Sequence, residues 1–434
     1  MVFNVLYLLA IGIVSPWIAV RRFRHGRYRR GVRQKLLGLS AVEARKLRGD
    51  ATDLVWVHAV SVGEVNLLVG LIDRLREQMP GVHLAISTST DTGYDLAVKH
   101  FGVDSVFFCP LDFTWAVRRT LRHLNCRMLV LTELEIWPNL IASASALGCD
   151  VVVVNGRLSE RSARGYQRFS WLTQPAFERL TAVACQDPLS AARFQACGVA
   201  ASRLHTTGNM KFDDAPEDRH HREVVERINW SGADPWHCVW CFGSTQDGEE
   251  AMALRVYKHL IDQHPELRLI LVPRHAERFD QVAALIKANG FRLIRRSRDD
   301  DQYHDQWDSD EVILIDTIGE LRQWWGVASI ATVGGSFGTR GGQNMLEPAG
   351  YGCAVSFGPN TVHFETIAGE LIEAGGATRL QDESELSTFV ANCLDDPGRI
   401  EREGEAARRV IQRHRGAQFR TIQSLRQAWS AGAA

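Results

Sequence analysis

The sequence predicts an α/β protein with two domains, each built on a parallel sheet that helices cover. Three observations support this fold class. The chain has 434 residues, which is too long for one ordinary hydrophobic core. Short apolar runs alternate with helix-length segments, first from Asp53 and again from Trp236. The polar stretch 213–223 separates the two series and predicts an exposed linker.

Composition and charge fit a globular protein that does not bind nucleic acid. Hydrophobic residues make up 45% of the chain, charged residues 23%, and the net charge is −1. The nine cysteines follow no disulfide pattern, so reduced thiols are expected. Cys238 and Cys241 have the spacing of a zinc or redox motif. They lie in an apolar run without a second pair, which favours a structural role.

The N-terminal segment predicts a membrane anchor. Residues 2–20 carry no charge and are just long enough to span a bilayer, or to lie in its surface. Residues 21–35 then contain eight Arg and Lys and no acid. Positive charge after the apolar segment keeps the following chain on the cytoplasmic side and attracts anionic lipids. The alternative is a buried N-terminal helix followed by a solvated basic face.

Apolar runs in the first half predict five strands, with helices such as 64–78 between them. The runs are 54–58, 83–87, 127–131, 151–154 and 182–185. In a doubly wound sheet, ligands bind beyond the C-terminal ends of the strands. The polar segments that follow these runs are therefore candidate site segments.

Two of these segments carry carboxylates. Ser61 and Glu64 have the spacing of a capping box, so Glu64 would bind the Ser61 backbone N–H or serve as a general base. Both interpretations stay open. Glu133 and Glu135 stand beside a Trp-Pro turn, a combination that suits sugar binding. The alternative is that these two acids only favour the start of the next helix.

A third segment is basic. Arg157, with Ser159, Ser162 and further arginines, could hold a phosphate or a carboxylate. The alternative is a solvated loop with a helix cap. Lys211 lies beyond a later strand-like run and opens the polar stretch that ends this half.

In the second half, the runs 238–242, 267–272, 312–316 and 327–333 predict further strands. Arg274 and His275 follow one of them, where a cationic cluster favours phosphate contact over a simple helix start. No Walker A, HExxH or nucleophile-elbow pattern occurs in the sequence, and no cluster has metal-ligand spacing.

The densest signal is the glycine-rich stretch 333–350. Four glycines occur within eight residues after an apolar run, namely Gly334, Gly335, Gly338 and Gly341. Asn344 and Glu347 then open a helix-like segment. A strand, a glycine turn and a helix N-terminus together expose backbone N–H groups, so we expect an anion site here. A flexible loop is the alternative.

Nine motifs follow one another along nearly the whole chain. They are Ser61-Val-Gly-Glu64, Thr132-Glu-Leu-Glu-Ile-Trp-Pro-Asn139, Arg157-Leu-Ser-Glu-Arg-Ser162, Gly208-Asn-Met-Lys-Phe-Asp213, Gly243-Ser-Thr245, Pro273-Arg-His275, Gly319-Glu-Leu321, Gly334-Gly-Ser336 and Asn344-Met-Leu-Glu-Pro348. In this order they resemble the lipid A Kdo transferases (3-deoxy-D-manno-octulosonic acid transferases), which are glycosyltransferases of the GT-B fold in bacterial inner membranes.

The resemblance implies a GT-B protein whose two Rossmann-like domains face a cleft. The expected parts are a membrane anchor at 1–22, a basic juxtamembrane segment at 23–50, an acceptor domain at 51–215 and a nucleotide-sugar domain at 225–434. The last helix could pack back on the first domain. The implied reaction moves Kdo from CMP-Kdo to a lipid A precursor with inversion, without metal or other cofactor, on the cytoplasmic face of the inner membrane.

The resemblance also implies roles for individual residues. Glu64 would be the catalytic base, and Glu135 and Lys211 would support the transition state. The donor-binding residues would be Pro273, Arg274, Ile318, Gly319, Glu320, Gly334, Gly335, Ser336, Asn344, Met345, Leu346 and Glu347. Contacts to the acceptor or to the Kdo carboxylate would come from Ser61, Gly63, Arg157, Ser159 and Ser162.

The chain departs from the family pattern at a few positions. Gln343 stands where a histidine usually precedes the asparagine, and 246–247 is Gln-Asp instead of His-Glu. Glutamine donates hydrogen bonds but carries no charge, so donor choice is open at this point. The alternatives are a GT-B enzyme that uses another nucleotide-sugar, and an inactive membrane-bound scaffold of the same fold.

Overall fold

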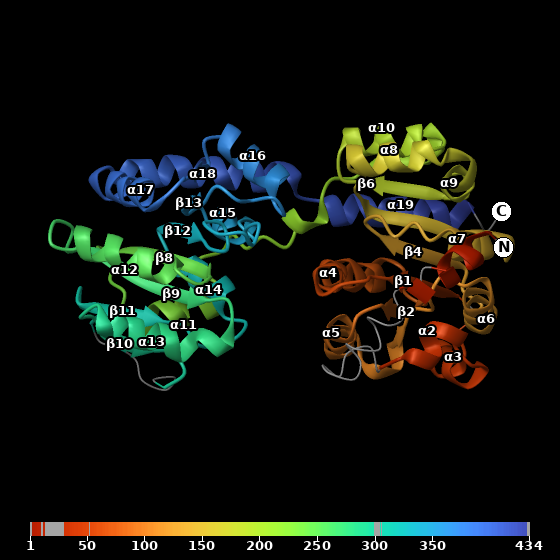
Figure 1. The fold of residues 1–434 in the computed structure, drawn as a ribbon, viewed down its shortest axis with the longest axis horizontal. Helices are drawn as coiled ribbons and strands as arrows, with labels where there is room; N and C mark the ends of the chain where they lie inside the picture. Colours follow the sequence, from red (N-terminus) through yellow and green to blue (C-terminus); the bar gives the residue numbers. More distant parts are fainter. Residues whose placement is uncertain are drawn as a thin grey trace. The chain divides into compact units, whose positions relative to one another are not determined.

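The structure is a computed structural model that describes residues 2–9, 12–13, 30–51, 53–298, 304 and 306–431. The chain forms two compact units, and Figure 1 labels most of their helices and many of their strands. The N-terminal unit comprises Met1–Asp213 and Arg415–Ala434, and the C-terminal unit comprises Asp214–His414. The chain thus returns to the N-terminal unit with its last helix, α19 (Ala417–Ala431).

The N-terminal unit contains a seven-stranded parallel sheet in the order β3-β2-β1-β4-β5-β6-β7. Its strands are β1 (Leu54–His58), β2 (His83–Thr88), β3 (Val106–Phe108), β4 (Met128–Thr132), β5 (Asp150–Gly156), β6 (Ala182–Cys185) and β7 (Leu204–Thr206). Its helices, besides α19, are α2 (Val32–Leu37), α3 (Ala41–Arg48), α4 (Val62–Gln78), α5 (Asp91–Phe101), α6 (Thr114–Leu124), α7 (Pro138–Ala146), α8 (Glu160–Arg168), α9 (Ser170–Phe177) and α10 (Pro188–Ala196). Short 3₁₀ turns are η1 (Val103–Ser105), η2 (Ala201–Arg203) and η3 (Met210–Phe212).

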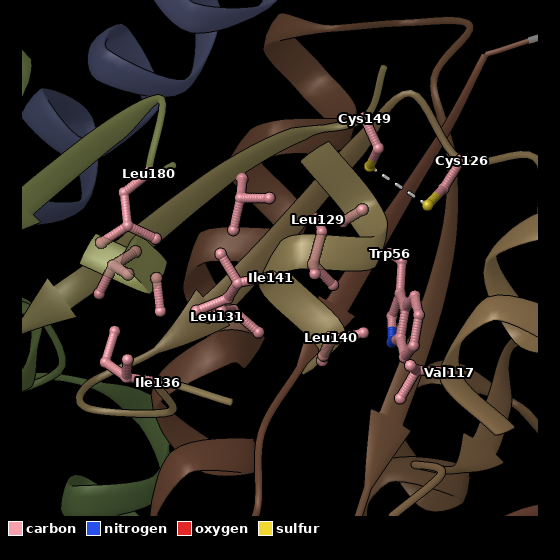
Figure 2. Close-up of a cluster of buried hydrophobic side chains, with 14 of the residues drawn as sticks. Trp56, Val117, Cys126, Leu129, Leu131, Ile136, Leu140, Ile141, Cys149 and Leu180 are labelled. Atoms are coloured by element: carbon pink, nitrogen blue, oxygen red, sulfur yellow. Dashed lines mark hydrogen bonds between the residues drawn. The ribbon is translucent and has the colours of Figure 1, made fainter. Parts of the chain in front are cut away.

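Helices cover both faces of this sheet, so successive strand residues enter two different cores. Trp56 of β1 belongs to one buried cluster, while its neighbours Val55 and Val57 belong to the other. Figure 2 shows the cluster that contains Trp56. Cys126 and Cys149 lie in it as free thiols whose sulfur atoms are 3.4 Å apart.

The C-terminal unit repeats the same architecture with the strand order β10-β11-β9-β8-β12-β13-β14. Its strands, again all parallel, are β8 (Cys238–Thr245), β9 (Leu267–Pro273), β10 (Arg292–Arg295), β11 (Glu311–Leu314), β12 (Ile330–Val333), β13 (Ala354–Phe357) and β14 (Ala377–Arg379). Its helices are α11 (Arg222–Ser231), α12 (Glu249–Leu260), α13 (Phe279–Ala288), α14 (Leu321–Val327), α15 (Leu346–Gly350), α16 (Glu365–Glu373), α17 (Glu383–Asp395) and α18 (Pro397–His414), with the 3₁₀ turn η4 (Ala276–Arg278). The predicted α/β class with two parallel sheets is confirmed.

The bounds of two local predictions differ from those in the structure. The run 327–333 was expected to be one strand, but helix α14 extends to Val327 and β12 begins only at Ile330. Helix packing explains this, because Trp324 of α14 is buried and its ring lies 5.6 Å from that of Trp230 in α11. The segment 295–310 was expected to be a loop, yet Arg295 ends strand β10.

The predicted anchor is described only in part. Residues 2–9 and 12–13 are helical, while residues 1, 10–11 and 14–29 lie outside the described residues. Within the part of the chain that the structure describes, no helix is both long enough and apolar enough to cross a membrane.

Candidate active site

Three glutamates and one lysine gather beyond the strand ends of the N-terminal unit. Glu64 lies in the first turn of α4, directly after β1, and Glu133 and Glu135 follow β4, the neighbour of β1 in the sheet. Lys211 lies in η3, after β7, and its Nζ is 3.0 Å from Glu133 Oε1. These side chains remain 40% and 29% exposed, so the pair is open to solvent and to ligands. The parallel sheet thereby brings together residues that are far apart in the sequence.

Two hydrogen bonds orient the Glu64 carboxylate. It accepts the backbone N–H of Val60 at 2.9 Å and the hydroxyl of Ser61 at 3.0 Å. The capping pattern predicted a bond to the Ser61 N–H, so the N–H that Glu64 binds comes one residue earlier in the chain. Burial raises the pKa of Glu64, repulsion from Glu133 adds to this, and the two hydrogen bonds and Lys211 oppose it. Glu64 is thus a fixed, partly exposed carboxylate.

Glu135 titrates near neutral pH. Burial raises its pKa to about 7, and the neighbouring charges of Glu64 and Glu133 add to the shift. The indole N–H of Trp137 donates to Glu135 at 2.6 Å and partly opposes the rise. A carboxyl group with this pKa exchanges protons readily at neutral pH.

Asp112 holds the turn that carries Glu135, and the sequence analysis missed it. Its carboxylate accepts the backbone N–H groups of Asn139 (3.0 Å) and Leu140 (2.7 Å), which begin helix α7 just after this turn. The hydroxyl of Tyr7 donates to the same carboxylate at 2.9 Å. Burial raises the pKa of Asp112 to about 6. No local motif marks this residue, because its partners lie at distant sequence positions.

The predicted basic nest forms a helix cap. Ser159 is the N-cap of α8, and its hydroxyl accepts the Ser162 N–H at 3.2 Å. The helix-cap interpretation of these two serines is confirmed. Arg157, which follows β5, is exposed. Gly63 lies in the first turn of α4. Because glycine has no side chain, Gly63 could contact a ligand only through its backbone N–H or carbonyl group.

In the C-terminal unit, the glycine-rich turn already holds an anion. The buried carboxylate of Glu249 accepts the backbone N–H groups of Gln246 (2.8 Å), Gly335 (2.9 Å), Ser336 (3.2 Å) and Phe337 (3.1 Å). These amides were expected to bind the anion of a ligand, and in this structure they bind the Glu249 carboxylate instead. Burial raises the pKa of Glu249, and the amide N–H groups oppose that rise.

A second buried glutamate supports the neighbouring turn. Glu250 pairs with Arg278 through two hydrogen bonds of 2.7 and 2.8 Å, and it also accepts the Thr245 hydroxyl at 2.6 Å. This arrangement fixes the end of β8 against η4. Neither glutamate was recognised from the sequence.

The other predicted donor-binding residues lie at strand and helix ends of this unit. Pro273 ends β9 and Arg274, which follows it, is exposed. Ile318 is 85% exposed, and Gly319 has a φ of 96°, which favours glycine. Glu320 is already paired, because Arg296 and Arg227 lie 3.0 and 3.1 Å from its carboxylate.

The segment before α15 is mixed in exposure. Asn344 is exposed and its amide donates to Glu347 at 3.3 Å. Burial raises the pKa of Glu347, and the charges of Arg322 and Arg274 oppose the rise. Arg274 is therefore close enough for its charge to act on the Glu347 carboxylate. Two further residues, Met345 and Leu346, are buried. These two can contact a nucleotide only through their backbone.

Comparison with known proteins decides the family. The family model described as 3-deoxy-D-manno-octulosonic-acid transferase (kdotransferase) matches residues 24–214. The 3-deoxy-D-manno-octulosonic acid transferase of Haemophilus influenzae is 34% identical over 376 residues, which cover 86% of each chain. The chain belongs to the Kdo transferase family. The enzyme of the same name from Bordetella pertussis is 33% identical and covers 96% of this chain and 98% of its own.

This membership confirms the resemblance that the ordered motifs predicted. A solved structure supports the fold as well: HepE of Anabaena, determined with UDP, has a TM-score of 0.55, is 11% identical, and covers 88% of this Kdo transferase family member and all of its own chain. At this identity the likeness concerns the fold alone.

Proposed function

We propose that the chain is an inverting glycosyltransferase of the GT-B type that moves Kdo from CMP-Kdo to a lipid A precursor. The observation that carries this proposal is the coincidence of family and chemistry. Membership of the Kdo transferase family is joined by a fixed carboxylate, Glu64, beside a second carboxyl group that titrates near pH 7 and a lysine.

The proposed reaction is a single displacement. An acceptor hydroxyl oxygen attacks the anomeric carbon of Kdo while the bond from that carbon to the CMP phosphate oxygen breaks, and CMP leaves with the electron pair. The hydroxyl proton passes to the Glu64 carboxylate. The raised pKa of Glu64 makes it a better proton acceptor, and its two hydrogen bonds fix its direction. Attack from the face opposite the leaving group inverts the anomeric carbon.

Positive charge and a second carboxyl group assist this step. Lys211 can offer its ammonium group to the Kdo carboxylate, because its side chain is 40% exposed. Glu135, with its pKa of about 7, can hold the acceptor by a hydrogen bond in either protonation state. In the C-terminal unit, the exposed Arg274 is the cation best placed by its strand end to stabilise the departing phosphate.

We also propose that the chain works at the cytoplasmic face of the inner membrane, held by its N-terminus. The helix over 2–9 is attached to the N-terminal unit by polar side chains: Asn4 accepts the Thr114 N–H at 3.1 Å, and Tyr7 donates to Asp112. Val5 and Leu9 of the same helix are 57% and 61% exposed. A helix with a docked polar edge and exposed apolar side chains suits an interfacial anchor, and a lipid acceptor makes such an anchor useful.

The proposal is tested by the mass of the product. Purified full-length protein is incubated in detergent with a lipid A precursor and either CMP-Kdo or a UDP-sugar, and the lipid is analysed by mass spectrometry. We expect lipid that carries Kdo with CMP-Kdo and unchanged lipid with the UDP-sugar. Transfer from the UDP-sugar alone would indicate a different GT-B enzyme, and no transfer from either donor would favour the inactive scaffold.

A further inference from the structure

The glycine-rich turn of the C-terminal unit has the form of an anion site. The N–H groups of Gly335, Ser336 and Phe337 are consecutive in the chain and point to one place, as in the backbone nests that bind phosphate. Gly335 has a φ of 68°, the left-handed conformation on which such a turn depends. In this chain the place is taken by the carboxylate of Glu249, which is 3% exposed.

The carboxylate of Glu249 packs closely against the backbone at Gly334. A Cβ atom on Gly334 would lie 2.7 Å from Glu249 Oε2 and 2.7 Å from the Ser244 carbonyl oxygen. Glycine at 334 is thus explained by the internal carboxylate, and no ligand is needed to explain it. Two like charges cannot share one nest, so a phosphate could bind there only if the Glu249 carboxylate left it. Because Glu249 is buried, its carboxylate would then lose its hydrogen bonds without gaining water, which costs free energy.

The turn that Glu249 holds also fixes the donor-side segment. The carbonyl of Gly335 accepts the N–H of Gly342 at 2.9 Å, and a Cβ on Gly335 would lie 3.2 Å from Gln343 Cγ. Gly342 and Gln343 lead directly into Asn344, which begins the segment expected to bind CMP. A continuous chain of contacts therefore runs from the Glu249 carboxylate to this segment.

We propose that Glu249 is a built-in anion: its carboxylate permanently fills the amide nest, so that the glycine-rich turn positions the donor-binding segment and does not itself bind the phosphate of CMP. Glu249 is then a positioning residue, and the phosphate is bound by side-chain cations such as Arg274. This inference rests on the proposed function only where it concerns CMP. The occupancy of the nest can be tested without a donor.

The first experiment uses inorganic phosphate as the probe. Thermal unfolding of the full-length protein is followed with and without millimolar phosphate, for the wild type and for Glu249→Ala. We expect phosphate to raise Tm clearly more in Glu249→Ala than in the wild type, because the emptied nest binds an anion in addition to any that side-chain cations hold in both proteins. Equal responses of the two proteins to phosphate, including no response in either, would overturn the proposal.

The matched control is Glu385→Ala. Glu385 is an exposed glutamate of the same unit, and its carboxylate accepts a single backbone N–H, that of Gln381, at 2.8 Å. Removing it creates no nest of several amides, so Tm of this variant should respond to phosphate only as the wild type does. If it responds as Glu249→Ala does, the response is a general effect of lost charge and the proposal fails.

The second experiment measures CMP binding by calorimetry. In Glu249→Gln an NH₂ group faces amide N–H donors, so the turn shifts, and we expect the Kd for CMP to rise about tenfold or more. Tighter CMP binding by Glu249→Ala would show that Glu249 merely competes with the donor. Unchanged CMP binding by Glu249→Gln would show that Glu249 does not position the donor-binding segment. Glu249→Gln conserves side-chain volume and serves if Glu249→Ala does not fold. If the wild type binds no CMP while the phosphate result holds, the proposed function fails and the built-in anion stands.

Discussion

The carboxylates of the two units differ in burial and in the number of hydrogen bonds that they accept. In the N-terminal unit, Glu64 accepts two hydrogen bonds and Glu135 accepts one, and both side chains are partly exposed. In the C-terminal unit, Glu249 accepts four backbone N–H groups and Glu250 three side-chain hydrogen bonds, and both are buried. All four residues follow strand ends. We propose from this difference that the partly exposed glutamates serve proton chemistry and that the buried ones serve the scaffold.

The largest effect is expected from Glu64→Gln. Loss of the proton acceptor should lower kcat by roughly two to four orders of magnitude, because a positioned general base contributes about that much. Tm should change little, since the side-chain volume is conserved. Initial rates by product mass and thermal unfolding measure the two quantities. Glu77→Gln, at an exposed position of the same helix, is the control and should keep the wild-type rate. A Glu64→Gln rate within threefold of the wild type would show that the partly exposed Glu64 does not serve proton chemistry, and the proposed difference between the glutamates of the two units would be lost.

Glu250→Ala should act on stability instead. It removes the buried carboxylate from the guanidinium of Arg278, whose side chain is 14% exposed, and leaves it the exposed carboxylate of Asp247 at 3.5 Å. Breaking a buried pair in this way costs about 3–5 kcal/mol of unfolding free energy. Chemical denaturation measures the loss, and the double variant Glu250→Leu/Arg278→Met should recover most of it. A Glu250→Ala protein as stable as the wild type would show that this carboxylate is not part of the scaffold.

Glu135→Gln should raise stability at high pH. The folded state holds the pKa of Glu135 at about 7, above its ordinary value of 4.5, so ionisation is unfavourable in the folded protein. Stability is therefore lost as pH rises from 4.5 through 7. Removing the charge should stabilise the protein at pH 8 by about 1–2 kcal/mol after solvent screening, and hardly at pH 4.5. Tm of both proteins at the two pH values checks this, and an equal difference at both would refute it.

The smallest effect is expected from Glu133→Gln. The pair that Glu133 forms with Lys211 is partly exposed, and such pairs contribute about 0–1 kcal/mol to the free energy of unfolding. The loss should shrink further in 0.5 M salt because exposed charges are screened. A loss of several kcal/mol would place Glu133 with the scaffold carboxylates.

The sequence predicted the fold where the local signal was strong. The apolar run at 54–58 became β1 with the same bounds, and 182–185 became β6. Short strands such as β14 (Ala377–Arg379) carry too few residues to show a pattern. The run at 327–333 misled because buried tryptophans draw its first residue into α14, which is a tertiary effect.

The site was predictable to the same extent. Glu64 could be named as a candidate because it follows a strong strand and opens a helix, and its role as the base stays a prediction. The role of Glu249 could not, since three of its four amide partners lie more than eighty positions away in the chain. A glycine-rich turn looks the same in sequence whether it binds a ligand or an internal carboxylate. Only the three-dimensional partners distinguish the two.

If the Glu64 carboxylate takes the acceptor proton, a small carboxylate should restore transfer to a variant that lacks this side chain, and chemical rescue tests this directly. Single-turnover transfer by Glu64→Ala is measured with increasing formate, which can supply a carboxylate in the space that the side chain leaves. We predict a rate near background without formate and a rate that rises with its concentration, while Glu250→Ala shows no such rise. Full activity of Glu64→Ala without formate, or a rate that formate leaves unchanged, would contradict the account.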